Sequence, residues 1–337
     1  TTDLVYRSDA GYKPELSVRG GTMNVNRRFG PLNGSASSDF EQSGGVLNIG
    51  VTGYVSNPNY GIFDLRNSSS MTWTGGTIEL RRTNRMTAFA GGDYYVGMSS
   101  GTVTGGLLRI DAQESGERLF EINSQMPVGE FLMTGTNDPI AKVLNNDLDV
   151  ISHITFAGAG SGRLDANDLD ISLGGDWINN TSATYTGFTA GSGTVTFNGD
   201  ADQYIKGQQS TSFTHLKLDD KEGGDVILDV DTEETLIRES LALIPEGTNT
   251  AILDLNQNLL IIGENGSLLT NDGSSVDDFD NTKYIRNSES SPGSGEYDGI
   301  LRREITTGIT ERTKLLYPVG DDTLYTPAEI TFRDNQA

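Results

Sequence analysis

Short runs of alternating apolar and polar residues recur along the chain, and a Gly-Gly pair interrupts four of them. The runs read LSVRGGTMNV at 16–25, FEQSGGVLNI at 40–49, SMTWTGGTIEL at 70–80 and GTVTGGLLRI at 101–110. Alternation with a period of two is the pattern of a half-buried β-strand. The first glycines of the pairs lie at positions 20, 44, 75 and 105. A motif that returns at such regular intervals indicates a stacked array of repeats.

The second half of the chain repeats as well, with three short runs in the same order in each period of about 25 residues. VILDV at 226–230 returns as AILDL at 251–255, and TLIRES at 235–240 returns as LLIIGEN at 259–265. LALIPEG at 241–247 corresponds to SLLTNDG at 267–273. We therefore predict an all-β protein, namely a parallel β-helix with about 25–30 residues per coil.

Two details follow from stacked coils. Inward side chains of successive coils form rows of like residues, and the repeat predicts that Leu228 lies over Leu253. The Gly-Gly pairs are expected at corners, where the backbone turns sharply and neighbouring coils approach too closely for a Cβ atom. An antiparallel sandwich or barrel is the alternative, because it also has short, regularly spaced strands. The best helix candidate, at positions 231–243, falls inside one period of the repeat and is predicted to be strand.

The organisation along the chain divides into three parts. We expect β-helix coils with Gly-Gly repeats at 1–160 and coils of a second repeat type at 161–275. The periodicity is lost near residue 276, so 276–337 is predicted to begin a β-sandwich-like domain that is cut short.

Composition and charge narrow the class of protein. The chain of 337 residues has 42 Gly, no Cys and a net charge of −23. Many glycines suit a chain with many tight turns. So acidic a chain is a poor ligand for nucleic acid or anionic membranes, because both attract clustered Lys and Arg. No run reaches the roughly 18 apolar residues of a membrane span, so we expect no membrane insertion in this segment.

Several motifs in the second half carry a family resemblance. GGDWINN at 174–180, AGSGTVTFNGDADQYIKG at 190–207, FTHLKLDD at 213–220 and LDLNQNLLIIG at 253–263 resemble repeats of large surface proteins of Bacteroidota. ILRREITTGITERTKLLYPVGDDTLYTPAEI at 300–330 is similar to the closing block of the same proteins. The similarity covers about residues 160–337, and the first half shares only the general style of β repeats.

The resemblance implies a fragment of an extracellular, cell-surface adhesin exported by the type IX secretion route, with members linked to gliding motility. We expect a non-enzymatic, rigid stalk that presents a binding surface to other surface proteins or extracellular glycans. It would be part of a longer chain or filament. The alternative is a carbohydrate-active β-helix enzyme, a polysaccharide lyase or hydrolase, because that scaffold also carries such enzymes.

No residue set predicts catalysis. Glycoside hydrolysis needs two carboxylates at a defined separation, and the pairs Asp219–Asp220 and Asp277–Asp278 lack the Gly-His-Gly and Arg-Ile-Lys motifs of β-helix polygalacturonases. The two histidines, His153 and His215, lie in strand-like runs, and we expect them to be solvent-facing or hydrogen-bonded. We therefore assign no catalytic, cofactor-binding or metal-binding residue.

Three weaker candidates remain for ligand contacts. The acidic loop at 271–281, with Asp272, Asp277, Asp278 and Asp280, offers the oxygen ligands that calcium prefers, but it is expected to be a solvated linker. LDANDLD at 164–170 is expected to be a turn with outward carboxylates. Trp73 and Trp177 could stack on sugar rings if exposed, although packing inside a coil is favoured for Trp177. In the Tyr94–Tyr95 pair one ring must face outward.

Overall fold

The computed structural model shows an all-β chain, as the sequence predicts. It describes residues 3–7, 13–33, 35–53, 55, 59–66, 69–84, 91–113, 118–134, 137–158, 162–182, 187–220, 223–231, 234–270, 279–288, 299–305, 313–321 and 324–332. Within these ranges the regular elements are strands, and no helix occurs. The chain forms two compact units, unit 1 (Thr1–Leu173 and Asn179–Gly193) and unit 2 (Gly174–Ile178 and Thr194–Ala337).

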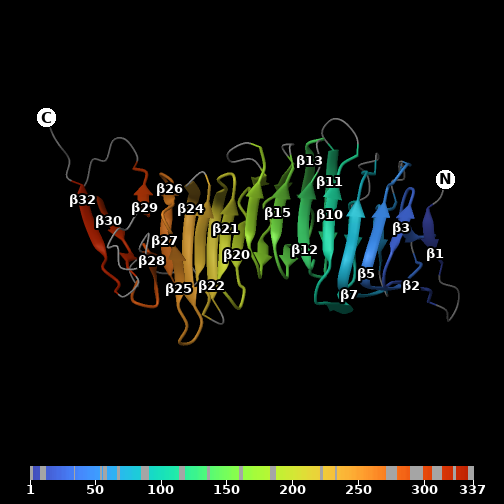
Figure 1. Ribbon diagram of the computed structural model, residues 1–337, viewed down its shortest axis with the longest axis horizontal. Helices are drawn as coiled ribbons and strands as arrows, with labels where there is room; N and C mark the ends of the chain where they lie inside the picture. Colours follow the sequence, from blue (N-terminus) through green and yellow to red (C-terminus); the bar gives the residue numbers. More distant parts are fainter. Residues whose placement is uncertain are drawn as a thin grey trace. The chain divides into compact units, whose positions relative to one another are not determined.

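Unit 1 consists of many strands, most of them short, that lie side by side along the unit (Figure 1). They are β1 (Leu4–Tyr6), β2 (Glu15–Val18), β3 (Thr22–Val25), β4 (Phe29–Pro31), β5 (Asp39–Ile49), β6 (Phe63–Leu65), β7 (Ser70–Leu80), β8 (Tyr94–Val96), β9 (Gly101–Val103), β10 (Leu107–Asp111), β11 (Arg118–Ser124), β12 (Glu130–Thr134), β13 (Pro139–Val143), β14 (Leu148–Val150), β15 (Ile154–Ala157), β16 (Arg163–Asp165), β17 (Ile171–Leu173), β19 (Phe188–Thr189) and the second half of β18 (Trp177–Asn180).

The strands of unit 1 form long parallel sheets in which each strand pairs with one from the next repeat. One sheet has the order β1-β4-β6-β8-β11-β13-β16-β19, and a second runs through β2-β5-β7-β10-β12-β15. β3 pairs with β5, β9 pairs with β7, and β14 pairs with β17. We call one such repeat, which contributes a strand to each sheet, a coil.

Like side chains stack inside unit 1 because the pairing is in register. Phe29 lies beside Phe63, and Phe63 beside Tyr94, with ring centroids 5.4 and 5.2 Å apart. All three side chains are buried. Burial of a large apolar side chain contributes about 1.5–3 kcal/mol, and an aromatic pair about 0.5–1.5 kcal/mol more. The inward rows therefore hold successive coils together.

The Gly-Gly pairs lie where the backbones of neighbouring coils touch, two of them inside the long strands β5 and β7 and the other two between consecutive strands. The second glycine of each pair has a left-handed φ, which is +69° at Gly21 and Gly45. A Cβ atom on Gly45 would lie 2.7 Å from the main chain of the preceding pair, and one on Gly76 would lie 2.6 Å from Gly44. The β5–β7 register also shifts near Ser43. The predicted close approach is confirmed.

Unit 2 repeats the arrangement with its own strands. They are the first half of β18, β20 (Thr194–Phe197), β21 (Gln203–Gly207), β22 (Ser212–Asp220), β23 (Val226–Val230), β24 (Glu234–Pro245), β25 (Ala251–Asp254), β26 (Leu259–Ile262), β27 (Ser267–Thr270), β28 (Lys283–Arg286), β29 (Ile300–Arg303), β30 (Thr313–Tyr317), β31 (Val319–Gly320) and β32 (Ala328–Phe332). Two parallel sheets run β18-β21-β23-β25-β28-β31 and β20-β22-β24-β26-β29, and β27 pairs with β24. The helix candidate at 231–243 is strand β24 in its described part, as predicted.

Two predicted stacks in unit 2 are wrong in register. Leu253 lies beside Val226 and not beside Leu228, so this coil is longer than the sequence repeat indicates. The repeat aligned Leu241 with Ser267, but in the structure Leu241 lies beside Leu268, one residue further along the strand. In both cases the turn before the strand holds more residues than the repeat predicted, and the inward apolar row stays continuous.

Parallel pairing continues beyond residue 276. β28 joins β25, β29 joins β26, and β31 joins β28. The exception among the described strands of unit 2 is the hairpin of β30 and β32, which is antiparallel. Among the described residues of this region, antiparallel pairing occurs at this hairpin and at the isolated bridges Asp280–Lys283 and Gly320–Tyr325.

Candidate functional site

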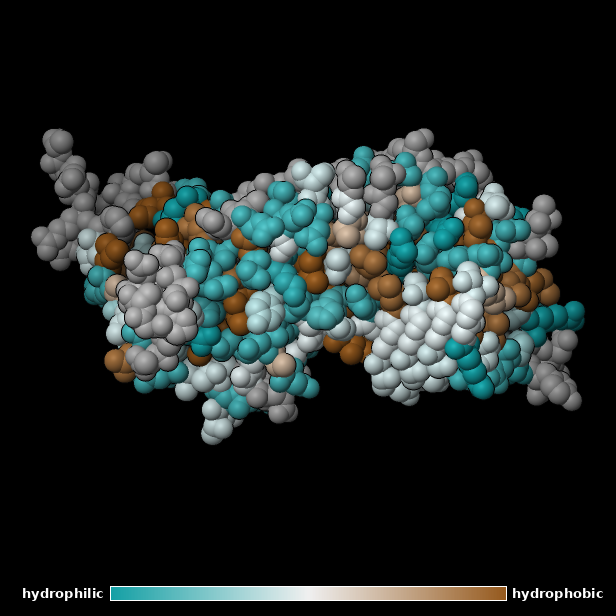
Figure 2. Space-filling model, in the orientation of Figure 1, coloured by the Kyte–Doolittle hydropathy of each residue, from teal (hydrophilic) through white to brown (hydrophobic). Residues whose placement is uncertain are grey.

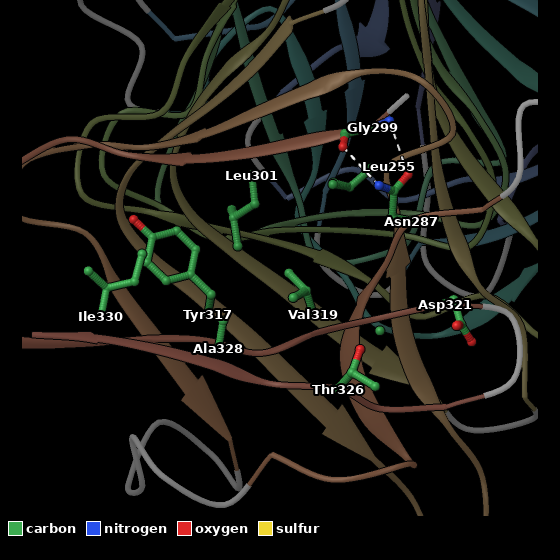
Figure 3. A pocket seen from close by; sticks show the side chains of 11 residues that line it. Leu255, Asn287, Gly299, Leu301, Tyr317, Val319, Asp321, Thr326, Ala328 and Ile330 are labelled. Atoms are coloured by element: carbon green, nitrogen blue, oxygen red, sulfur yellow. Dashed lines mark hydrogen bonds between the residues drawn. The ribbon is translucent and has the colours of Figure 1, made fainter. Parts of the chain in front are cut away.

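A cavity of about 440 Å³ lies in unit 2, between the last parallel strands and the β30–β32 hairpin. Most of its lining is apolar, and Figure 3 shows side chains from both sides turned toward the same space. The parallel side contributes Leu255, Leu301 and Val319, and the hairpin side contributes Tyr317, Ala328 and Ile330. A volume of this size accommodates a small ligand or a pair of apolar side chains.

The polar groups at the cavity hold the surrounding turns. The Asn287 amide donates to the Gly299 carbonyl and accepts from the Gly299 N–H, both at 3.0 Å (Figure 3). The carboxylate of Asp321 accepts from the Leu324 N–H at 2.8 Å. Because these groups are already satisfied, the site is suited to an apolar group and not to a charged one.

The hairpin is amphipathic across its two faces. Ala328 and Ile330 face the cavity, and Glu329 between them pairs with Lys314 at 2.9 Å on the other face. Ile330 remains 43% exposed, so the apolar face of the hairpin is only partly covered. A two-stranded sheet is marginal alone, and its apolar contact with the parallel strands stabilises it.

Filling the cavity is expected to abolish binding of an apolar probe. We expect the neutral dye Nile red to gain fluorescence with the unmodified chain and to lose that gain in Ala328→Trp, because the indole occupies the apolar space. Glu329→Trp is the matched control, since residue 329 lies on the opposite face. Equal dye fluorescence in the two variants would contradict the assignment.

A buried charge cluster in unit 2 joins three coils. The Arg286 guanidinium lies 2.8 Å from an Asp225 oxygen and 2.6 Å from an Asp254 oxygen, and the Ser288 hydroxyl donates to Asp254 at 2.6 Å. Burial raises the pKa of Asp225, and the Arg286 charge opposes that rise. Asp254 is 4% exposed. The cluster is therefore a cross-link between coils.

A second cluster lies on unit 1. The Arg66 guanidinium donates to both carboxylate oxygens of Asp64, and the guanidinium carbons of Arg28 and Arg66 lie 4.3 and 4.9 Å from the centre of the Tyr60 ring. Burial raises the pKa of Asp64, and its bonds with Arg66 oppose the rise. Because its charges are paired within the unit, this cluster stabilises the outer surface and leaves little charge for a ligand.

Among the described carboxyl groups of unit 1, Asp93 has the most strongly shifted pKa. Its two oxygens accept from the backbone N–H groups of Asn84 at 2.7 Å and Glu121 at 3.0 Å. Burial raises the pKa of Asp93 to about 7, more than these hydrogen bonds lower it. Burial also raises the pKa of the neighbouring Glu121.

The Asp93 shift predicts that stability falls as the pH rises. The folded state holds a proton on Asp93 between about pH 4 and 7 where the unfolded chain does not, so the unfolding free energy falls by up to about 1.4 kcal/mol per pH unit across this window. Chemical denaturation at several pH values measures the slope. Asp93→Asn is expected to flatten the dependence of the unfolding free energy on pH. The asparagine amide has one acceptor oxygen in place of two, so one of the two backbone hydrogen bonds is lost. An unchanged slope in the variant would assign the effect to other groups.

The two histidines are placed as the sequence suggests. His215 Nδ1 lies 2.7 Å from the Ser240 hydroxyl, and Nε2 lies 3.3 Å from a Glu239 oxygen. A register shift between Phe213 and His215 brings the adjacent side chains of β24 to this one imidazole. His153 is half-buried on a different unit. The structure does not bring the two histidines together within either unit.

The aromatic candidates divide between core and surface. Trp73 and Trp177 are fully buried, which excludes stacking on an external sugar. The Trp177 indole donates to the Thr211 hydroxyl at 3.1 Å. Tyr94 is buried and Tyr95 half-buried, with its ring close to Gly97, so one ring faces outward as predicted.

The acidic candidates that the structure describes bind neighbouring groups of the chain itself. Asp280 accepts from the Thr282 N–H and hydroxyl at 2.7 and 2.6 Å. Burial works against ionisation, but these bonds and Lys283 outweigh it and lower the pKa of Asp280. Asp219 pairs with Lys217 at 3.1 Å. Asp272, Asp277 and Asp278, and the side chain of Asp220, lie outside the described residues.

LDANDLD forms the expected turn. Asn167 and Asp168 have φ of 54° and 63°, and the Asp165 carboxylate accepts from the Asn167 N–H at 2.9 Å. Asp168 is exposed and accepts from the Ser192 N–H at 2.8 Å. The Asp165 carboxylate therefore closes its own turn, and the Asp168 carboxylate binds the backbone of the next coil. Across the described part of the chain no three His, Cys, Asp or Glu side chains are grouped to hold a metal.

Comparisons with known proteins give no match. No protein-family model, curated protein or solved structure is similar to the chain. Among the residues that the structure describes, no helix is long and apolar enough to span a membrane.

Proposed function

We propose that this chain is a stiff, non-enzymatic segment of a large secreted cell-surface adhesin. Its parallel coils would form a β-helix that acts as a spacer, and the β30–β32 hairpin would begin a β-sandwich-like domain. Other surface proteins or extracellular glycans would be its partners. The observation that carries the proposal is the in-register parallel pairing of successive strands in both units.

The pairing gives a physical reason for stiffness. Main-chain hydrogen bonds run from coil to coil, and so do the inward apolar rows and the cross-linking charges at Arg286. To bend or extend such a segment, whole rows of bonds and contacts must break together. The sequence resemblance to Bacteroidota surface proteins supports the cellular setting, and the mechanical role rests on the pairing.

Location and chain size test the proposal. Protease treatment of intact source cells should release peptides of this chain, and a blot should detect a native protein much larger than 36.2 kDa. A free secreted chain of about that mass that depolymerises polysaccharide would overturn the proposal in favour of an enzyme.

Single-molecule pulling tests the mechanical part. If coils detach one at a time, unfolding should proceed in steps of roughly 80–120 Å, which is the extended length of about 25–34 residues at about 3.3–3.6 Å each. Collapse of each unit in one step at low force would contradict a coil-by-coil spacer.

A further inference from the structure

The first coil of unit 1 presents a free face. β1 pairs only with β4, and β2 and β3 pair only with β5, so each has one unpaired edge among the described strands. An unpaired edge exposes a row of N–H and C=O groups that accept a further strand.

Each of the three strands at this face has one half-buried inward side chain, next to a buried one at Tyr6, Val18 or Val25. Leu4, Leu16 and Met23 are half-buried, whereas their partners in the second coil, Phe29, Phe40 and Leu47, are at most 2% exposed. A cavity of about 200 Å³ opens beside Leu4, Leu16 and Phe29. Apolar surface is visible at this end of unit 1, where β1 and β2 lie, at the right of Figure 2. The rows thus lack one layer.

The glycine pairs indicate what the missing layer is. At Gly44, Gly45 and Gly75, a Cβ atom would approach the main chain of the preceding coil within 2.6–2.9 Å. No atom lies within 4 Å of a Cβ at Gly20 or Gly21. The φ of +69° accounts for glycine at position 21, but no such φ occurs at Gly20. The pair Gly20–Gly21 therefore has the same sequence as the later pairs, although no preceding coil lies close enough to exclude a Cβ atom.

We propose that the face formed by β1, β2 and β3 is an internal surface that binds one further parallel coil of the same polypeptide, entering ahead of Thr1. This rests on the proposed function as a segment of a longer stacked chain. The added coil places apolar side chains over Leu4, Leu16 and Met23 and its main chain over Gly20. The direction follows from the glycines, since the close contacts of the later pairs run to the preceding coil.

An extended chain tests the proposal. The segment 1–25 is duplicated ahead of Thr1, because Leu4 pairs with Phe29 and this segment therefore spans one full period. Hydrogen exchange then follows the amides of β1–β3 in the original and the extended chain. We expect protection to rise about tenfold or more in the extended chain, since edge strands open most readily. A control extension carries Lys at the added copies of residues 4, 16 and 23 and should give no protection.

Gly20→Ala supplies an independent readout. It should leave the denaturation midpoint unchanged in the original chain and lower it in the extended chain, and Gly44→Ala should lower it already in the original chain. Unchanged protection in the extended chain, or full protection of β1–β3 in the original chain at low concentration, would overturn the proposal. Protection that rises with concentration in the original chain would identify a second copy as the occupant and also overturn it. These results are independent of whether the chain is found on the cell surface.

Discussion

Replacing Arg286 with methionine is expected to lower the free energy of unfolding by about 3–5 kcal/mol. The substitution keeps an apolar stem like that of arginine but removes the guanidinium, so the carboxylates of Asp225 and Asp254 lie close together without their shared cation. Both carboxylates are largely buried, with side chains 18% and 5% exposed, so water replaces the lost interaction poorly. Chemical denaturation measures the loss.

The matched control is Arg302→Met. Arg302 and Glu304 form a pair at 3.4 Å whose side chains are about half exposed. Such a pair contributes about 1 kcal/mol or less. Equal losses in the two arginine variants would contradict a cross-linking role for Arg286.

The Arg286→Met loss should also depend on pH. Burial raises the pKa of Asp225, and removal of the opposing Arg286 charge raises it further. At lower pH the folded variant takes up a proton on this carboxyl, so the charge without a partner disappears. The difference in unfolding free energy between the variant and the original chain should therefore shrink as the pH falls.

Gly45→Ala is expected to destabilise unit 1 by about 3–5 kcal/mol, whereas Gly21→Ala is expected to cost about 1–2 kcal/mol. The two glycines share a φ of +69°, so an alanine has the same conformational cost at both positions. They differ in their surroundings. A Cβ at Gly45 would lie 2.7 Å from main-chain atoms of Gly20 and Gly21, and a Cβ at Gly21 meets nothing within 4 Å.

The difference between these two variants isolates the close approach of neighbouring coils. It is measured from the denaturation midpoints of both proteins under the same conditions. A difference close to zero would mean that the coils separate enough at this bend to admit a methyl group, and the stacking explanation for the Gly-Gly repeats would fail.

The sequence was sufficient to predict the strands but not their register. Alternation marks which residues face inward, and a shift by one full alternation preserves that pattern. The match of AILDL to VILDV placed Leu253 beside Leu228, whereas the structure places it beside Val226, two residues along the strand and still on the inward face. The true step depends on the turn between β24 and β25, which holds more residues than the repeat predicts and has no periodic signal.

The candidate site was harder to predict from the sequence, because it too depends on the register in which the coils stack. Arg286 meets Asp225 and Asp254 only because three coils stack in one register, and no local motif links these positions. The cavity likewise depends on how β30 and β32 pack against Leu255 and Leu301. A single position such as Trp177 was easier to predict, because packing inside a coil was favoured there and the side chain is buried.

The turns between the strands of unit 1 differ in length, whereas the inward side chains stay in register from coil to coil. Leu4, Phe29, Phe63 and Tyr94 lie in neighbouring strands of one sheet, yet the stretches of sequence between them are unequal, and the longest separates Phe29 from Phe63. Doubling the length of a flexible loop costs only about 0.6 kcal/mol in closure entropy. Insertions and deletions between strands can therefore accumulate in the gene while the stacked rows persist. The same tolerance makes these turns suitable places to graft foreign peptides for display at regular intervals.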